Sequence, residues 1–136
     1  MTITLGDIAK LRSGWCEIIE VGNLPFGVAS EIGVFSTLVY LSRESLLHIN
    51  EKHPDISDID LLLSCLVIQN GMVVQEKAKP NAYVCSYIEP NSQLRYVAVL
   101  KVASPDREML MTSFRRLRRR QTRSFLRRGR LIKKHP

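Results

Sequence analysis

The second half of the chain holds four β-rich runs separated by very short breaks, and this spacing restricts the fold more than any other feature. The runs cover residues 72–75, 82–88, 94–102 and 108–114, and the breaks between them contain proline, asparagine or aspartate. β-Branched and aromatic residues favour strands, and these break residues favour turns. Connections this short favour antiparallel pairing of neighbouring strands. We therefore expect a strand meander.

The first seventy residues favour helices and two further strands. Ser42 is a good helix N-cap, Glu44 suits the positive end of the helix dipole, and Pro54 prevents continuation, which predicts a helix of about three turns over residues 42–53. A second helix is expected over 55–68, and strands over 17–21 and 34–40. Helices early and strands late predict one α+β domain over residues 1–136, with neighbouring strands antiparallel.

Charge divides this domain into two parts. Residues 1–114 carry nine Lys/Arg and thirteen Asp/Glu, a formal charge of −4, whereas residues 115–136 carry eleven Lys/Arg and no acid, a charge of +11. We expect a basic helix or tail there, with Gly129 closing the helix and residues 130–133 forming a tail or an edge strand. This asymmetry favours a polyanion as partner, most often nucleic acid, and less often an acidic protein or a membrane surface.

Several functional classes find no support in the sequence. Residues 61–68 form the longest apolar stretch, too short for a bilayer, and residues 1–10 do not resemble a signal peptide. The three cysteines lack metal or redox spacing, which predicts reduced thiols in a cytoplasmic protein. There is no glycine-rich phosphate loop, and His48 and His53 lie about 140° apart on a regular helix, unsuited to one ion. We expect no metal and no cofactor.

The remaining polar set suits metal-independent cleavage of RNA. His48, Lys52 and His53 lie on the expected helix, Lys101 on a strand, and Thr112-Ser113 near a strand end. Attack by the RNA 2′-hydroxyl needs a base, an acid for the leaving 5′-oxygen, and groups that stabilise the phosphate charge. Imidazole serves as base or acid near neutral pH, while cations and hydroxyls stabilise the charge.

The same residues carry a resemblance to a known family. Gly22-Asn-Leu-Pro, Val-Tyr40-Leu-Ser42, His48-Ile-Asn-Glu-Lys-His53-Pro, Tyr96-Val-Ala-Val-Leu-Lys101 and Met111-Thr-Ser-Phe114 together resemble a phage-associated nuclease family. It belongs to the barnase–EndoU–colicin–RelE (BECR) superfamily of metal-independent ribonucleases. The resemblance runs from about residue 22 to 132, and its signal is the order of individually weak motifs.

The resemblance implies an α+β fold with N-terminal helices packed on an antiparallel sheet. It also implies an endoribonuclease that leaves a cyclic phosphate and binds RNA across the sheet and its helix edge. It places His48, His53, Lys101, Thr112 and Ser113 in the active site. Expected partners are RNA, with tRNA one candidate substrate, and a cognate inhibitor or immunity protein. The expected nucleic-acid contacts come from cations of the helix, a strand and the basic segment: Lys52, Arg95, Arg115, Arg116, Arg118, Arg119, Arg120 and Arg123.

Each of these residues also has a purely structural interpretation. His53 could stabilise the end of its helix, His48 and Lys52 could be solvated surface residues, and Lys101 could protect a strand edge. Thr112 and Ser113 are expected to alternate faces, so that only one reaches a cleft. The alternative function is therefore a nucleic-acid-binding module without catalysis that uses the arginine-rich segment.

Overall fold

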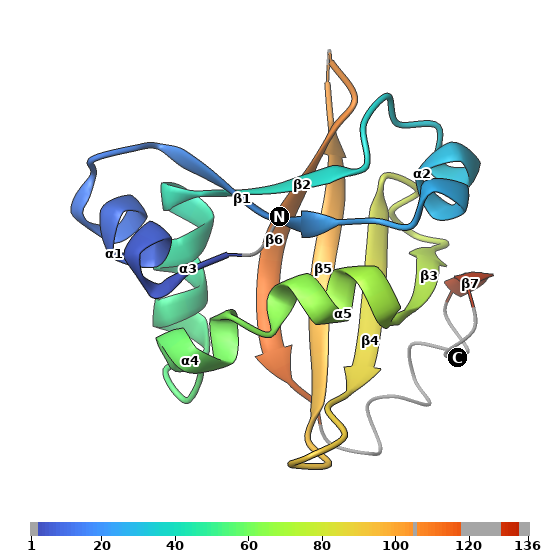
Figure 1. Cartoon of the computed structure of the whole chain (residues 1–136). Coiled ribbons are helices and arrows are strands. Elements are labelled where there is room, and N and C mark those ends of the chain that lie inside the picture. Colours follow the sequence, from blue (N-terminus) through green and yellow to red (C-terminus); the bar gives the residue numbers. More distant parts are fainter. Residues whose placement is uncertain (1–2, 105, 118–128, 134–136) are drawn as a thin grey trace.

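A seven-stranded mixed β-sheet with helices against it forms the framework of the protein (Figure 1). The computed structural model describes residues 3–104, 106–117 and 129–133. The helices are α1 (Leu5–Ser13), α2 (Phe26–Ile32), α3 (Arg43–Lys52), α4 (Asp58–Leu61) and α5 (Ser64–Asn70). The strands are β1 (Ile18–Asn23), β2 (Leu38–Ser42), β3 (Met72–Glu76), β4 (Ala82–Ile88), β5 (Arg95–Ala103), β6 (Glu108–Arg116) and β7 (Gly129–Lys133).

The helices largely follow the predicted signals. Ser42 caps α3 by accepting a hydrogen bond from the backbone N–H of Ser45, as predicted. The single helix expected over 55–68 is instead two short helices, because the chain turns at Leu62 and Leu63 between α4 and α5. The short helix α2, which follows Pro25, was not among the predicted elements.

The sheet confirms the meander and corrects one feature of the prediction. Its strand order is β1-β2-β6-β5-β4-β3-β7, and β3 to β6 pair antiparallel in sequence. The expected purely antiparallel sheet is wrong at β2 and β6, which pair parallel through Val39–Met109 and Tyr40–Leu110. A long crossover containing helices and strands joins these two strands, and such a crossover permits parallel pairing where a tight turn does not. The α+β class is correct.

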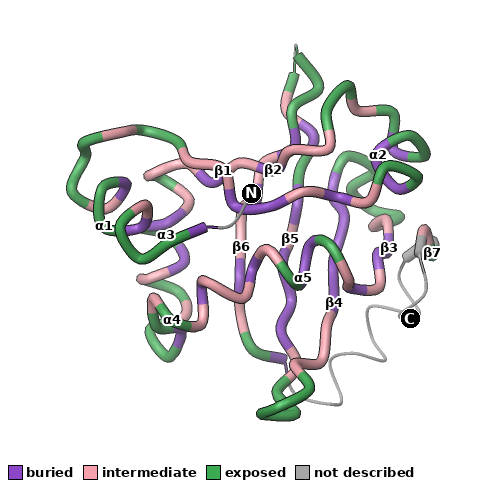
Figure 2. Tube along the Cα trace, viewed as in Figure 1, coloured by how far each residue is buried: buried purple, intermediate pink, exposed green. Residues whose placement is uncertain are grey.

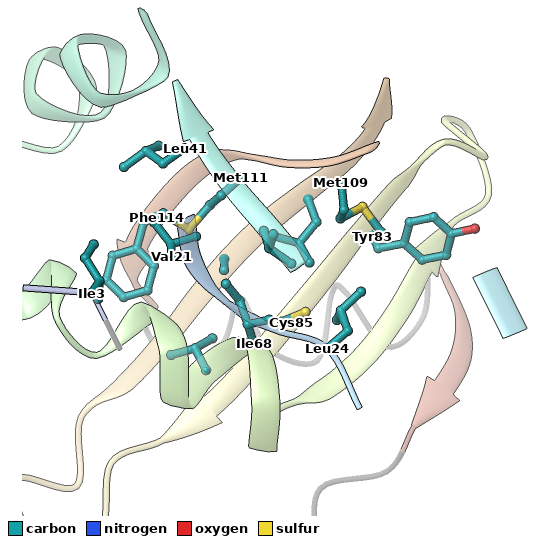
Figure 3. Close-up of a cluster of buried hydrophobic side chains, with 14 of the residues drawn as sticks. Ile3, Val21, Leu24, Leu41, Ile68, Tyr83, Cys85, Met109, Met111 and Phe114 are labelled. Carbon is teal, nitrogen blue, oxygen red and sulfur yellow. The ribbon is translucent and has the colours of Figure 1, made fainter. Parts of the chain in front are cut away.

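The core lies between the sheet and the segments that cross one of its faces. Figure 1 shows α5 and the antiparallel pair β1–β2 in front of β4, β5 and β6. Buried positions recur along the central strands in Figure 2, and Figure 3 shows Val21, Ile68 and Phe114 in the same cluster. A Cβ on Gly22 would stand 3.0 Å from the Cα of Cys65, so glycine allows α5 to lie directly on β1.

The end of β6 changes the expected division between body and basic segment. β6 continues through Arg115 and Arg116, so these two arginines belong to the sheet. Gly129–Lys133 forms β7, which pairs with β3 at the edge of the sheet. This agrees with one of the two alternatives considered for residues 130–133. The helix expected after Phe114 is wrong at Arg115 and Arg116, which continue β6, and the rest of it falls mostly on residues 118–128, which lie outside the described residues.

Candidate active site and nucleic-acid interface

The face of the sheet turned away from the main core carries most of the predicted site residues. In β5, Tyr96, Ala98 and Leu100 belong to the main core, so Val97, Val99 and Lys101 point to the opposite face. Val84, Val97 and Leu117 form a small second apolar cluster there. We call this surface the outer face.

His53 lies where α3 meets the end of β6. It is the C-cap of α3, and its backbone N–H donates to the carbonyl of Ile49 at 2.8 Å. Arg116 holds the following turn by donating to the carbonyl of Asp55 at 2.8 Å and to its carboxylate at 3.2 Å. The half-buried His53 is thereby fixed next to the end of β6, where Arg115 also lies.

The environment of His53 favours a neutral imidazole. Burial lowers the pKa of His53 from its ordinary value of 6.5, and the positive charge of Arg115 lowers it further. The carboxylate of Asp55 opposes this shift, whereas His48 and Lys52 lower the pKa of His53 by smaller amounts. A neutral imidazole within the electrostatic influence of a guanidinium can accept a proton while the guanidinium attracts an anion.

The two other predicted residues of α3 are exposed. His48 and Lys52 both face solvent, yet both are close enough to influence the charge of His53. His53 has left helical geometry, with φ −130° and ψ 69°, so the angular separation expected for a regular helix does not apply to it. Lys52 and His53 lie at the C-terminal end of α3, whereas His48 lies more than one turn earlier, near the middle of the helix.

A β-bulge brings Thr112 and Ser113 to the same face, contrary to the expectation that they alternate. Ser113 pairs with Val99, and the next registered pair is Met111 with Leu100, so Thr112 is an extra residue in β6. Ser113 shares the outer face with its partner Val99. Thr112 lines a pocket on that face, and its hydroxyl donates to the carbonyl of Val99 at 3.4 Å.

That pocket unites Lys101 with Thr112 in a volume of about 360 Å³. The residues around it come from β3, β4, β5, β6 and the loop before β4: Glu76, Lys79, Pro80, Asn81, Ala82, Val99, Lys101 and Thr112. None of the described histidines lines it. Along β6, Thr112 and Arg115 are three residues apart, about 10 Å. The predicted site therefore divides into a histidine cluster and a lysine pocket at two places along β6.

The other predicted contacts have different environments. Arg95 is half-buried on β5, and its guanidinium donates to the hydroxyl of Ser86 at 2.9 Å. The guanidinium of Arg116 forms a salt bridge with the carboxylate of Asp55. Four of the predicted contacts lie outside the described residues: Arg118, Arg119, Arg120 and Arg123.

Only Lys101 and Thr112 of the eight residues that line the pocket were predicted as site residues. The 79–81 stretch was recognised only as a break between strands, and Glu76 was not considered. The signal that could have found them is the pairing of Ala82 with Lys101, which places the start of β4 beside Lys101. Register between strands is not visible in local sequence patterns, so this proximity could not be deduced.

The remaining observations assign no metal site, no membrane span and no family to the described residues. Among the described residues, no group of three or more His, Cys, Asp or Glu side chains is arranged to hold a metal ion. No helix within the described ranges is long and apolar enough to cross a membrane. Comparisons with protein-family models, curated proteins and solved structures gave no match for this chain.

Proposed function

We propose that this protein is a metal-independent endoribonuclease of the BECR type, with His53 as its general base. The observation that carries the proposal is the position of His53, a half-buried imidazole at the junction of α3 and β6 whose pKa is lowered by burial and by the charge of Arg115. Its lowered pKa keeps the imidazole neutral at neutral pH, which a proton acceptor requires.

The proposed reaction uses the RNA itself as nucleophile. His53 accepts the proton of a 2′-hydroxyl, and the 2′-oxygen then forms a bond to the adjacent phosphorus. The bond from phosphorus to the 5′-oxygen breaks, and the leaving oxygen takes a proton from His48. The products are a 2′,3′-cyclic phosphate and a 5′-hydroxyl. Arg115 stabilises the negative charge that builds on the phosphate oxygens, a contribution of preorganised cations that is often large.

The outer face supplies the expected path for the RNA. From the histidine cluster, the outer residues of β6 lead through Ser113 and Thr112 toward Lys101. Cations and hydroxyls in such a row contact phosphates and sugars without selecting a base. In this arrangement Lys101, Thr112 and Ser113 bind the strand beside the cleavage point rather than exchanging protons with it.

One observation favours the second candidate function, a nucleic-acid-binding module without catalysis. Among the residues that the structure describes, no histidine lines the pocket that contains Lys101 and Thr112, so the groups expected to cooperate do not surround one reacting phosphate. Under this alternative the outer face and the arginine-rich segment hold RNA, and His53 only ends α3.

The test is incubation of the purified full chain with mixed cellular RNA in excess EDTA, with His53→Ala and His48→Ala in parallel. We expect the unaltered protein to cut RNA and leave 2′,3′-cyclic phosphate ends. His53→Ala should lose cleavage by a factor of about 100 or more, the scale of a lost general base. Binding of RNA by His53→Ala should persist in a filter-binding assay.

Two results would reject the endoribonuclease. Intact RNA after long incubation with folded protein leaves only the binding module. Equal cleavage by the unaltered protein and by His53→Ala would remove His53 from the chemistry. Circular dichroism of each variant separates these outcomes from simple unfolding.

A further inference from the structure

The pocket around Lys101 has the composition of a site for a small anionic ligand with a polar ring. Two cations, Lys79 and Lys101, stand at a pocket whose apolar surface comes from Ala82 and Val99. Glu76 and Asn81 add an acceptor and an amide. Its volume of about 360 Å³ falls near the lower end of the range for small-molecule sites.

Hydrogen bonds fix the loop that forms one wall of this pocket. The backbone N–H of Ala82 donates to the carbonyl of Lys79 at 2.8 Å. The backbone N–H of Val102 donates to the carbonyl of Asn81 at 2.9 Å. Between them, the carbonyl of Pro80 accepts from the side-chain amide of Gln75 at 2.8 Å. Three successive carbonyls are therefore tied to the sheet, and the wall exists before a ligand arrives.

We propose that this pocket binds one nucleotide of the RNA, with its phosphate on Lys79 and Lys101 and its base against Val99 and Ala82. This proposal rests on the proposed endoribonuclease function and adds a base-binding subsite to it. Thr112 lies about 10 Å along β6 from Arg115. That distance exceeds hydrogen-bond reach, so the nucleotide in the pocket is a neighbour of the one whose 2′-hydroxyl is deprotonated.

Glu76 gives the subsite a preference among bases. A carboxylate is only an acceptor, so it favours bases that present an exocyclic amino group, which carries two N–H donors. Adenine, cytosine and guanine carry such a group, whereas uracil presents only its ring N3–H between two carbonyl oxygens, which repel a carboxylate. The pocket therefore binds AMP, CMP and GMP more tightly than UMP, and replacing Glu76 by glutamine reduces that difference.

The experiment is a calorimetric titration of the full chain with each of the four 5′-mononucleotides and with inorganic phosphate, in low salt and EDTA. Lys79→Ala should weaken AMP binding about tenfold, the scale of one charge-assisted hydrogen bond. Lys77→Ala is the matched control, because Lys77 is exposed in the same loop and does not line the pocket. It should change AMP binding less than twofold.

The outcomes distinguish this inference from the proposed function. Phosphate binding as tight as AMP binding, or equal affinity for UMP and AMP, would overturn the nucleotide assignment. RNA cleavage without any mononucleotide binding would overturn the subsite and leave the endoribonuclease intact. AMP binding that depends on Lys79, in a protein that cuts no RNA, would support the pocket and reject the cleavage.

Discussion

The hydroxyl of Tyr96 in β5 donates a 2.7 Å hydrogen bond to the carboxylate of Asp60 in α4. The ring of Tyr96 is buried and stacks on Phe114 of β6, with centroids 5.6 Å apart. Asp60 also accepts from the backbone and hydroxyl of Ser57, which closes the capping box of α4. A buried strand residue thus holds the start of the helical segment that leads into α5.

We expect Tyr96→Phe to lower the free energy of unfolding by about 1.5 kcal/mol, because it removes a hydrogen bond to a charged group and keeps the stacked ring. Tyr40→Phe on the outer face is the matched control, with an expected change below about 0.5 kcal/mol. Urea denaturation of both variants measures the difference. Equal stability of the two variants would show that the Tyr96 hydroxyl contributes nothing.

The same contact makes stability depend on alkaline pH. Burial, together with the nearby Asp60 carboxylate, raises the pKa of Tyr96 from 10.0 to about 12. The folded protein therefore retains this proton at pH values where the unfolded chain loses it. The stability that protonated Tyr96 contributes is fully present below pH 10 and is lost as the pH rises toward 12. Unfolding free energies measured between pH 9 and 11 should fall less steeply for Tyr96→Phe than for the unaltered protein.

Gly71, between α5 and β3, allows a close approach that no side chain permits. A Cβ there would lie 2.5 Å from the carbonyl oxygen of Val67 and 2.9 Å from that of Ser86. Gly71→Ala should therefore cost at least about 2 kcal/mol of stability. The control is Gly27→Ala in α2, where a Cβ meets nothing within 4 Å and should stabilise the helix by about 0.5–1 kcal/mol. The midpoint temperature of thermal unfolding should fall for Gly71→Ala and rise for Gly27→Ala.

Local patterns in the sequence were sufficient for most elements and insufficient for the site. The cap at Ser42 and the short breaks after residue 71 predicted α3 and the β3–β6 meander, because capping and turns depend on neighbouring residues. The parallel pairing of β2 with β6 and the bulge at Thr112 depend on register between distant segments. These features place Thr112 and Ser113 on one face and Arg115 beside His53, so the grouping of site residues could not be predicted.

The charge of Arg115 should control the protonation of His53. Burial lowers the pKa of His53 most, followed by Arg115, so Arg115→Gln should raise this pKa toward 6.5. Lys52→Gln, the control, should raise it less, because Lys52 has the smallest influence. NMR titration of the His53 ring protons measures both shifts, and a larger shift in Lys52→Gln would contradict the arrangement. Because the folded-state pKa is lowered, the stability that neutral His53 contributes is present above pH 6.5 and is lost as pH falls below it.

The arginine-rich segment should determine the salt dependence of RNA binding. Replacing Arg118 and Arg119 by glutamine removes two expected phosphate contacts, so the slope of log affinity against log salt should fall by about 1.4 for single-stranded RNA. The matched control replaces Lys10 and Lys77, two exposed cations of the body, and should leave the slope nearly unchanged. Because β7 pairs with β3, these substitutions are a cleaner test than truncation, which would remove a strand of the sheet. An unaltered slope in the arginine variant would instead indicate that the segment docks on the acidic body or on an acidic protein.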